Sequence, residues 1–210
     1  ELTEIYCRFV QTTPDLGSLI RDKKKLIMKA LFGGEVENNV HYLRQLALED
    51  RQARDVARED LLEALTEVLA ALPVYRTYVR SLKVAARDLD YVKETFAEVR
   101  RQNPYIDPLA LDFLEWVLQL EFPAYLTPEQ RHEWLNVVMR LQQFTGPITA
   151  KGFEDTVLYI YNPLISLNEV GGDFQAVTAE DFHRFNQRRR QTSPGTLNAT
   201  STHDTTRSED

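Results

Sequence analysis

The chain has 210 residues, of which 43% are hydrophobic and 27% charged, enough apolar material for one or two helical cores. Its formal net charge of −7 argues against a nucleic-acid partner, because phosphate binding requires clustered positive charge, whereas a neutral substrate such as a sugar is compatible. The single cysteine, Cys7, excludes an intrachain disulfide, and the lack of a long apolar run or signal peptide predicts a cytoplasmic chain with no membrane partner.

Four amphipathic helices are predicted in the first half of the chain. Their apolar residues recur at steps of three and four, which places them on one face of a helix. The first helix ends at Gly33-Gly34, Pro73 stops the third, and Asn103-Pro104 closes the fourth. The apolar faces lie within residues 19–31, 36–47, 61–72 and 89–99.

Two further helices are predicted after the fourth. The fifth spans residues 110–121. The sixth begins at Thr127, which has capping-box spacing with Gln130 and is followed by a proline at the first helical position. We expect this helix to end near Pro147. The predicted helical subdomains are residues 1–103 and 104–147.

The last part of the chain has a different character, with β-branched and aromatic residues in place of the helical pattern. Thr178 indicates one more helix start, with Phe182 and Phe185 on its inner face. Residues 196–202 have the composition of a short strand. We therefore interpret residues 148–210 as barrel-derived segments attached to the helical part.

Basic runs and histidines are candidates for binding sites, but ordinary roles fit them better. The runs at residues 21–25 and 188–190 are more typical of solvated helix faces than of anion sites in a chain with this acidic total. His41, His132 and His183 have no second ligand at metal spacing. The sequence therefore predicts no metal site and no cofactor.

Two tyrosine pairs could stack on a sugar ring. They are Tyr75 with Tyr78 and Tyr159 with Tyr161. Packing against neighbouring helices accounts equally well for such rings. Both interpretations stay open at the level of sequence.

The pair His203-Asp204 is the strongest candidate for chemistry. It follows the predicted strand, where a barrel enzyme would place a substrate-binding imidazole and a carboxylate. The chain stops six residues later, and it begins at Glu1 rather than at a methionine. We therefore expect an internal piece of a larger enzyme, with the rest of the catalytic barrel as its partner.

Several stretches closely resemble the sequences of the maltooligosyl trehalose synthases, which belong to the α-amylase family. The signature around His203-Asp204 is the most specific of them, and the others occur in the same order as in the family. The resembling stretches are residues 23–28, 73–78, 150–156, 161–173, 196–205 and 207–210.

The sequence departs from the family pattern in three places. Thr206 replaces a lysine, which removes a cation of long reach near the His-Asp pair. The tripeptide at residues 193–195 is Ser-Pro-Gly rather than Trp-Pro-His, a change that concerns local packing more than chemistry. Phe174 stands where a proline is common.

The resemblance implies a mainly α-helical chain that forms helical insertion subdomains of a (β/α)8-barrel enzyme. The implied activity is that of an isomerase that rebuilds the reducing-end α-1,4 bond of a maltooligosaccharide as an α,α-1,1 bond. Asp204 is then a catalytic carboxylate, and His203, Lys151 and Arg207 bind substrate. The nucleophile and the acid/base of a retaining mechanism would lie outside this chain, so the chain alone is expected to be inactive.

Two other interpretations remain. One is a different α-glucan transferase or hydrolase of the same family, which the stretches at residues 151–156 and 167–173 argue against. The other is a helical interaction module with no catalytic ancestry. The dominance of helix favours that module, and the His-Asp ending argues against it.

Overall fold

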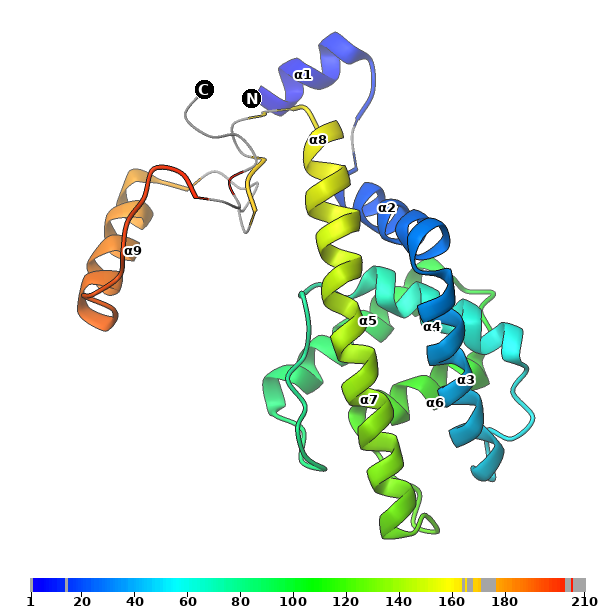
Figure 1. The fold of residues 1–210 in the computed structure, drawn as a ribbon. Helices are drawn as coiled ribbons and strands as arrows, with labels where there is room; N and C mark the ends of the chain where they lie inside the picture. Colours follow the sequence, from blue (N-terminus) through cyan, green and yellow to red (C-terminus); the bar gives the residue numbers. More distant parts are fainter. Residues whose placement is uncertain are drawn as a thin grey trace. The chain divides into compact units, whose positions relative to one another are not determined.

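The computed structural model describes residues 2–13, 15–163, 165, 168–170, 177–202 and 205. Over these ranges the chain is mainly helical and contains no strand, and none of the helices in them is long and apolar enough to cross a membrane (Figure 1). The mainly α-helical class predicted from the sequence is confirmed. The backbone divides into two compact units, which are described separately below.

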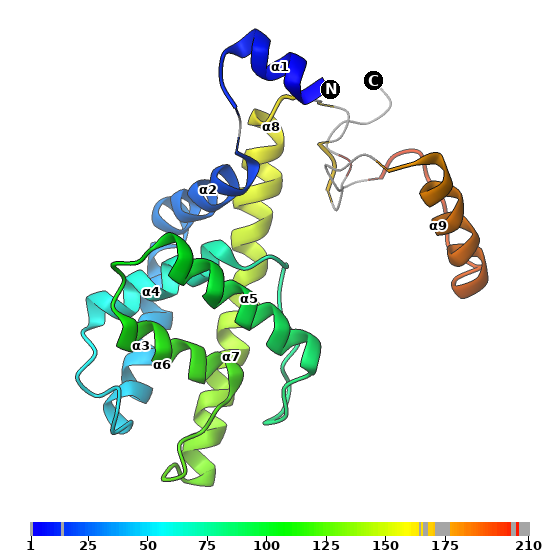
Figure 2. The same ribbon diagram turned by 180° about the vertical axis from the view of Figure 1, so that it is seen from behind.

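The larger unit, Asp15–Val157, is a bundle of helices (Figures 1 and 2). Its elements are α2 (Leu16–Leu31), α3 (Gly33–Glu49), α4 (Arg58–Ala71), α5 (Ala86–Gln102), α6 (Pro108–Gln119), α7 (Pro128–Thr149) and the π-helix η1 (Ala150–Val157). The helix predicted first is α2, and it does end before Gly33. Only Phe32 separates it from α3, so the two glycines open the second helix.

The predicted capping box at the start of α7 is present. The Thr127 hydroxyl accepts from the Gln130 backbone N–H at 3.3 Å, and the Gln130 side chain accepts from the Thr127 backbone N–H at 2.9 Å. These two hydrogen bonds satisfy backbone donors that a helix start otherwise leaves unpaired. A short local pattern was sufficient to fix this helix start.

One core runs through the larger unit, with α4 at its centre. Leu61 and Leu65 of α4 are fully buried, and α4 contacts α2, α3, α5, α6 and α7. Trp134 of α7 packs edge-on against Phe113 of α6 with ring centroids 5.8 Å apart. The structure thus groups residues differently from the predicted subdomains 1–103 and 104–147, because helices on both sides of Asn103 bury their apolar faces against the same α4.

Helix α7 does not end near Pro147 as predicted. Pro147 lies inside the helix, and the chain continues as the π-helix η1. A proline in a helix costs roughly 3 kcal/mol, because it removes one hydrogen bond and clashes with the preceding turn. Ile148 and Val157 are fully buried beyond it, and burying two such side chains is worth about 3–6 kcal/mol, which offsets that cost.

The smaller unit comprises residues 1–14 and 158–210. Its helices are α1 (Leu2–Val10), α8 (Leu158–Ile160) and α9 (Ala179–Thr192). The sequence did not predict α1. Thr178 caps α9 as predicted, accepting from the Asp181 N–H at 3.1 Å.

Two predictions for the smaller unit are wrong. Phe182 and Phe185 are 57% and 58% exposed, so within the described residues α9 has no buried inner face. Residues 196–202 form no strand. A strand requires a neighbour to pair its backbone groups, and the described ranges offer no other strand to this segment.

Candidate functional site

Lys151 is the one predicted site residue within the described part of the chain. His203, Asp204 and Arg207 lie outside the described residues, as does Thr206. Their roles therefore stay predictions. The structure does show the segment around Lys151 and the helices that position it, and on the larger unit it also shows a groove that Lys151 does not line.

Lys151 is exposed and belongs to η1. Its Nζ lies 2.5 Å from Oδ2 of Asp155, one turn further along. The Thr156 hydroxyl donates to the Lys151 carbonyl at 2.8 Å, a spacing of five residues that suits the wider turn of a π-helix. An exposed ion pair of this kind stabilises a fold by at most about 1 kcal/mol, so it orients the ammonium group more than it holds the helix.

Gly152 brings η1 into close contact with α2. A Cβ at this position would lie 2.9 Å from both Cα and Cγ of Lys24. Such a distance is well inside van der Waals contact, and one of the two atoms belongs to the backbone, so only glycine allows this approach. The crossing of α2 and η1 thereby fixes the place of the neighbouring Lys151.

We expect Gly152→Ala to lower the free energy of unfolding by about 1–3 kcal/mol, because the added methyl group forces α2 and η1 apart. Gly146→Ala is the matched control, since nothing lies within 4 Å of its Cβ and the residue is inside α7. The control should be neutral or stabilising by up to roughly 1 kcal/mol. Urea denaturation of both variants makes the measurement, and equal stability of the two would contradict the close crossing.

Lys24 itself is buried, which corrects the prediction that residues 21–25 form a solvated face. Its side chain is only 3% exposed, and Nζ donates to the Leu72 carbonyl at 2.9 Å. That carbonyl lies at the C-terminal end of α4, where the helix dipole favours a cation. Burial nevertheless lowers the pKa of Lys24 from 10.5 to about 8.

The segment that follows Leu72, residues 73–79, is held in place by the buried side chain of Gln142. Oε1 of Gln142 accepts from the Thr77 hydroxyl at 3.2 Å and from the Val79 N–H at 2.9 Å, and its Nε2 donates to the Val79 carbonyl at 2.8 Å. Gln142 therefore pairs both backbone groups of Val79 from a neighbouring helix. Sequence reasoning missed Gln142, and its only signal is a polar residue beside apolar positions of α7.

This anchored segment leaves two tyrosines accessible. Tyr75 and Tyr78 are 41% and 59% exposed, so the helices of this unit do not cover them. The guanidinium carbon of Arg76 lies 4.9 Å from the centroid of the Tyr78 ring, and Arg76 Nη1 donates to Gln143 Oε1 at 3.2 Å. Of the two interpretations left open by the sequence, the exposed fractions favour an available surface over buried packing.

In the smaller unit, Asn168 anchors another stretch that resembles the family. The side chain is fully buried, and its amide nitrogen donates to the carbonyls of Leu158, at 2.9 Å, and of Tyr161. Its backbone N–H donates to the Ile165 carbonyl at 3.0 Å. These bonds connect Asn168 to the backbone of Leu158 in α8, of Tyr161 and of Ile165. Tyr159 is 57% exposed, and burial raises the pKa of the Tyr161 phenol.

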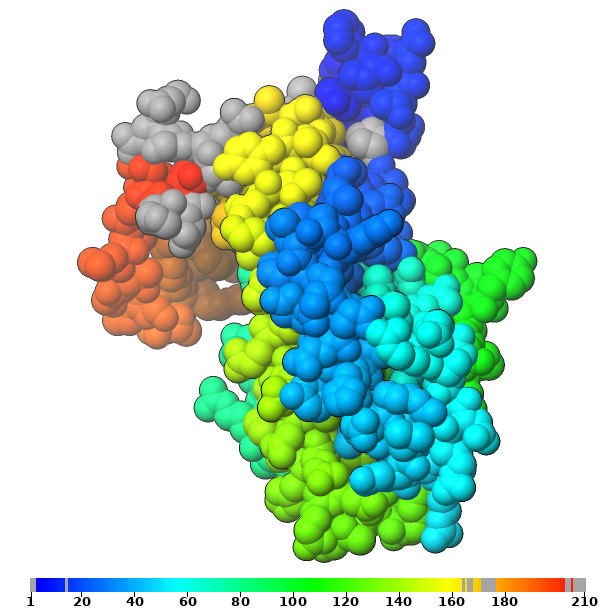
Figure 3. Space-filling view, turned by 45° about the vertical axis from the view of Figure 1, so that its right-hand side comes forward, coloured from blue at the N-terminus to red at the C-terminus, as the bar shows by residue number. Residues whose placement is uncertain are grey.

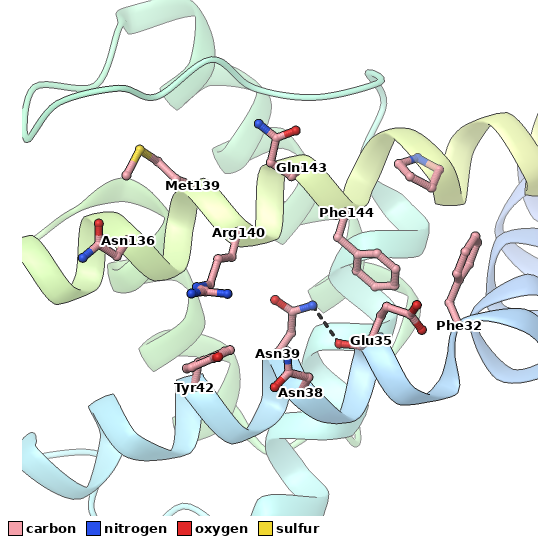
Figure 4. A pocket seen from close by; sticks show the side chains of 11 residues that line it. Phe32, Glu35, Asn38, Asn39, Tyr42, Asn136, Met139, Arg140, Gln143 and Phe144 are labelled. Carbon is pink, nitrogen blue, oxygen red and sulfur yellow. Dashed lines mark hydrogen bonds between the residues drawn. The ribbon is translucent and has the colours of Figure 1, made fainter.

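A groove of about 800 Å³ lies between α3 and α7, which run side by side on one face of the larger unit (Figure 3). Figure 4 shows its lining seen from close by. Amide and aromatic side chains dominate it. The amides are Asn38, Asn39, Asn136 and Gln143, and the aromatic residues are Phe32, Tyr42 and Phe144.

Comparison with known proteins gives a consistent result. No protein-family model matches the chain. A protein of Mycobacterium tuberculosis that is provisionally named a maltooligosyl trehalose synthase is 43% identical over 74 residues, which is 34% of this chain and 10% of that protein. The chain therefore matches a small part of this relative's length.

Solved structures match over more of the chain. The maltooligosyltrehalose synthase of Arthrobacter ramosus superposes with a TM-score of 0.75 and 28% identity, over 99% of this chain and 24% of that one. A glycosyltrehalose synthase designated DSM5389 matches with a TM-score of 0.55 and 30% identity, over 90% of this chain and 19% of that one. The chain is thus similar over nearly its whole length to a part of the maltooligosyl trehalose synthases, and the resemblance predicted from its sequence is confirmed.

Proposed function

We propose that this chain forms part of an enzyme that converts the reducing-end α-1,4 linkage of a maltooligosaccharide to an α,α-1,1 linkage by intramolecular transglucosylation. The observation that carries the proposal is the match of 99% of the chain to the Arthrobacter ramosus synthase at a TM-score of 0.75. The names of the matched proteins supply the substrate class and the product.

The reaction requires a retaining mechanism with two carboxyl groups. A nucleophilic carboxylate displaces the reducing-end glucose and forms a glycosyl-enzyme bond, while an acid/base residue protonates the departing oxygen. The same acid/base then takes the proton from the anomeric hydroxyl of that glucose, which attacks the intermediate and forms the new bond. We place both of these groups outside this chain.

We assign to Asp204 the stabilisation of the positive charge that develops on the sugar ring, and to His203 a hydrogen bond to the same ring. Lys151 and Arg207 would bind sugar hydroxyls. The close crossing at Gly152 supports this role for Lys151, because it fixes the backbone from which the exposed Lys151 side chain extends. The helices would also cover the site, so that the released glucose attacks before water does.

The chain alone should have no synthase activity, because a stabilising carboxylate can neither form the glycosyl intermediate nor protonate the leaving oxygen. The measurement is analysis of the products from maltohexaose, with the complete enzyme as the positive control. Trehalosyl sugars from the complete enzyme support the proposal. Shorter or rearranged α-1,4 glucans from it would instead identify another α-glucan transferase or hydrolase, and turnover by the purified chain would refute the assigned roles.

A further inference from the structure

The groove between α3 and α7 has the lining of a site for a neutral ligand rich in hydroxyl groups. Amide side chains both donate and accept hydrogen bonds, as hydroxyls do. Asn38 and Asn136 are exposed on opposite sides of the groove, and neither side chain hydrogen-bonds to another group within the part of the chain that the structure describes (Figure 4). Asn39, by contrast, is buried and donates to the Glu35 carbonyl at 2.8 Å.

The charges in the groove balance one another. Arg140 points from α7 toward α3 and lies over the Tyr42 ring, 4.5 Å from its centroid (Figure 4). Glu35 is the one acid among the residues that line the groove. A lining with one cation, one anion and several amides favours neither a polyanion nor a cation.

Flat side chains give the groove a surface for a sugar ring. The guanidinium carbon of Arg140 lies over the Tyr42 ring, and Phe32 meets Phe144 edge-on with centroids 5.7 Å apart. The C–H face of a pyranose packs well on such planar groups, while the amides beside them can bond to its hydroxyls. A partner helix would instead require a continuous apolar stripe, which the amides interrupt.

We propose that this groove binds an unbranched α-1,4-glucan, with a sugar ring against Tyr42 and Arg140 and its hydroxyls bonded by Asn38 and Asn136. The preference for a neutral polyhydroxyl ligand follows from the groove itself. The choice of an α-1,4-glucan rests on the proposed function.

The experiment is an NMR titration of the chain with maltohexaose, which resolves the side-chain amides of asparagine and reports a Kd. Cellohexaose, of the same size and hydroxyl number, serves as the control sugar. We expect the amide signals of Asn38 and Asn136 to shift with maltohexaose, and Asn136→Ala and Tyr42→Ala each to weaken binding about tenfold, the equivalent of one lost hydrogen bond or stacking contact. Tyr105→Ala, which removes a ring that is 98% exposed on another surface, should leave the Kd unchanged.

Tyr42 packs partly against the core, so Asn136→Ala, at an exposed position, is the decisive variant. An unchanged Kd for Asn136→Ala, the absence of binding, or equal affinity for cellohexaose would overturn the proposal. These results do not bear on the trehalosyl product of the complete enzyme. Conversely, the proposed function would be wrong if the complete enzyme made no trehalosyl sugar. The titration would still decide separately whether the groove binds maltohexaose.

Discussion

Replacing Asp204 by asparagine in the complete enzyme should lower kcat about 10²- to 10³-fold, equivalent to roughly 3–4 kcal/mol of transition-state stabilisation. Asparagine keeps the shape and the hydrogen-bonding reach of aspartate but loses its charge. The charge matters most when the sugar ring becomes cationic, so KM should change much less than kcat.

His203→Ala supplies the comparison for this prediction. The imidazole would bond to the ring in both the ground state and the transition state, so its loss should weaken binding and rate together, by a smaller factor. Steady-state kinetics on a maltooligosaccharide separates the two cases. If Asp204 only caps a turn, asparagine is an equally good cap, and an Asp204→Asn enzyme with near-normal kcat would establish that structural role instead.

Local patterns predicted most of the helices in the larger unit. The apolar spacing in residues 36–47 and 61–72 corresponds to α3 and α4, and the Thr127 box fixed the start of α7. Such patterns are sufficient where the helix periodicity and the tertiary burial agree. The sequence could not predict that Pro147 lies inside a helix. The burial that keeps the helix intact beyond this proline involves residues distant in the chain.

The candidate site was less predictable than the fold. Lys151 and Arg207 were assigned through family resemblance, whereas His203 and Asp204 also stood out by their place after a predicted strand. Of these four residues only Lys151 lies within the described part of the chain. Gly152 positions the segment around Lys151, and Gln142 positions residues 73–79. Both residues act through contacts with segments far away in sequence. A glycine in a helical stretch and a glutamine beside apolar positions have no distinctive local pattern, so neither could be singled out.

Lys24 illustrates a different limit: its spacing of four residues from Met28 places it on the buried face of α2, but the general preference of lysine for solvent argued for an exposed run. The larger unit packs α2, α4 and η1 around it, and its ammonium group reaches only the Leu72 carbonyl as a hydrogen-bond partner within the described ranges. The charged form therefore lacks the hydration it would have in the unfolded chain. This difference connects the packing of the bundle to a measurable dependence on pH.

The stability of the chain should rise with pH above about 8 because of Lys24. The folded-state pKa is about 8 and the unfolded value is 10.5, so between these pH values the unfolded chain binds more protons than the folded one. The free energy of unfolding should consequently increase by about 2–3 kcal/mol from pH 7 to pH 10 through this one group. Below pH 8 the Lys24 side chain is charged in both the folded and the unfolded state. Burial of this charge then lowers the free energy of unfolding by its full amount.

Lys24→Met isolates this contribution, because it removes the titrating group but keeps an unbranched apolar stem. We expect the difference in unfolding free energy between the parent chain and Lys24→Met to shift by about 2–3 kcal/mol in favour of the parent chain between pH 7 and pH 10. Other titrating groups cancel in this difference. Lys29→Met, at an exposed position of the same helix, should show no such shift. Urea denaturation at the two pH values makes the comparison, and parallel behaviour of the two variants would mean that Lys24 is hydrated in solution and does not carry the buried charge that its position in the bundle implies.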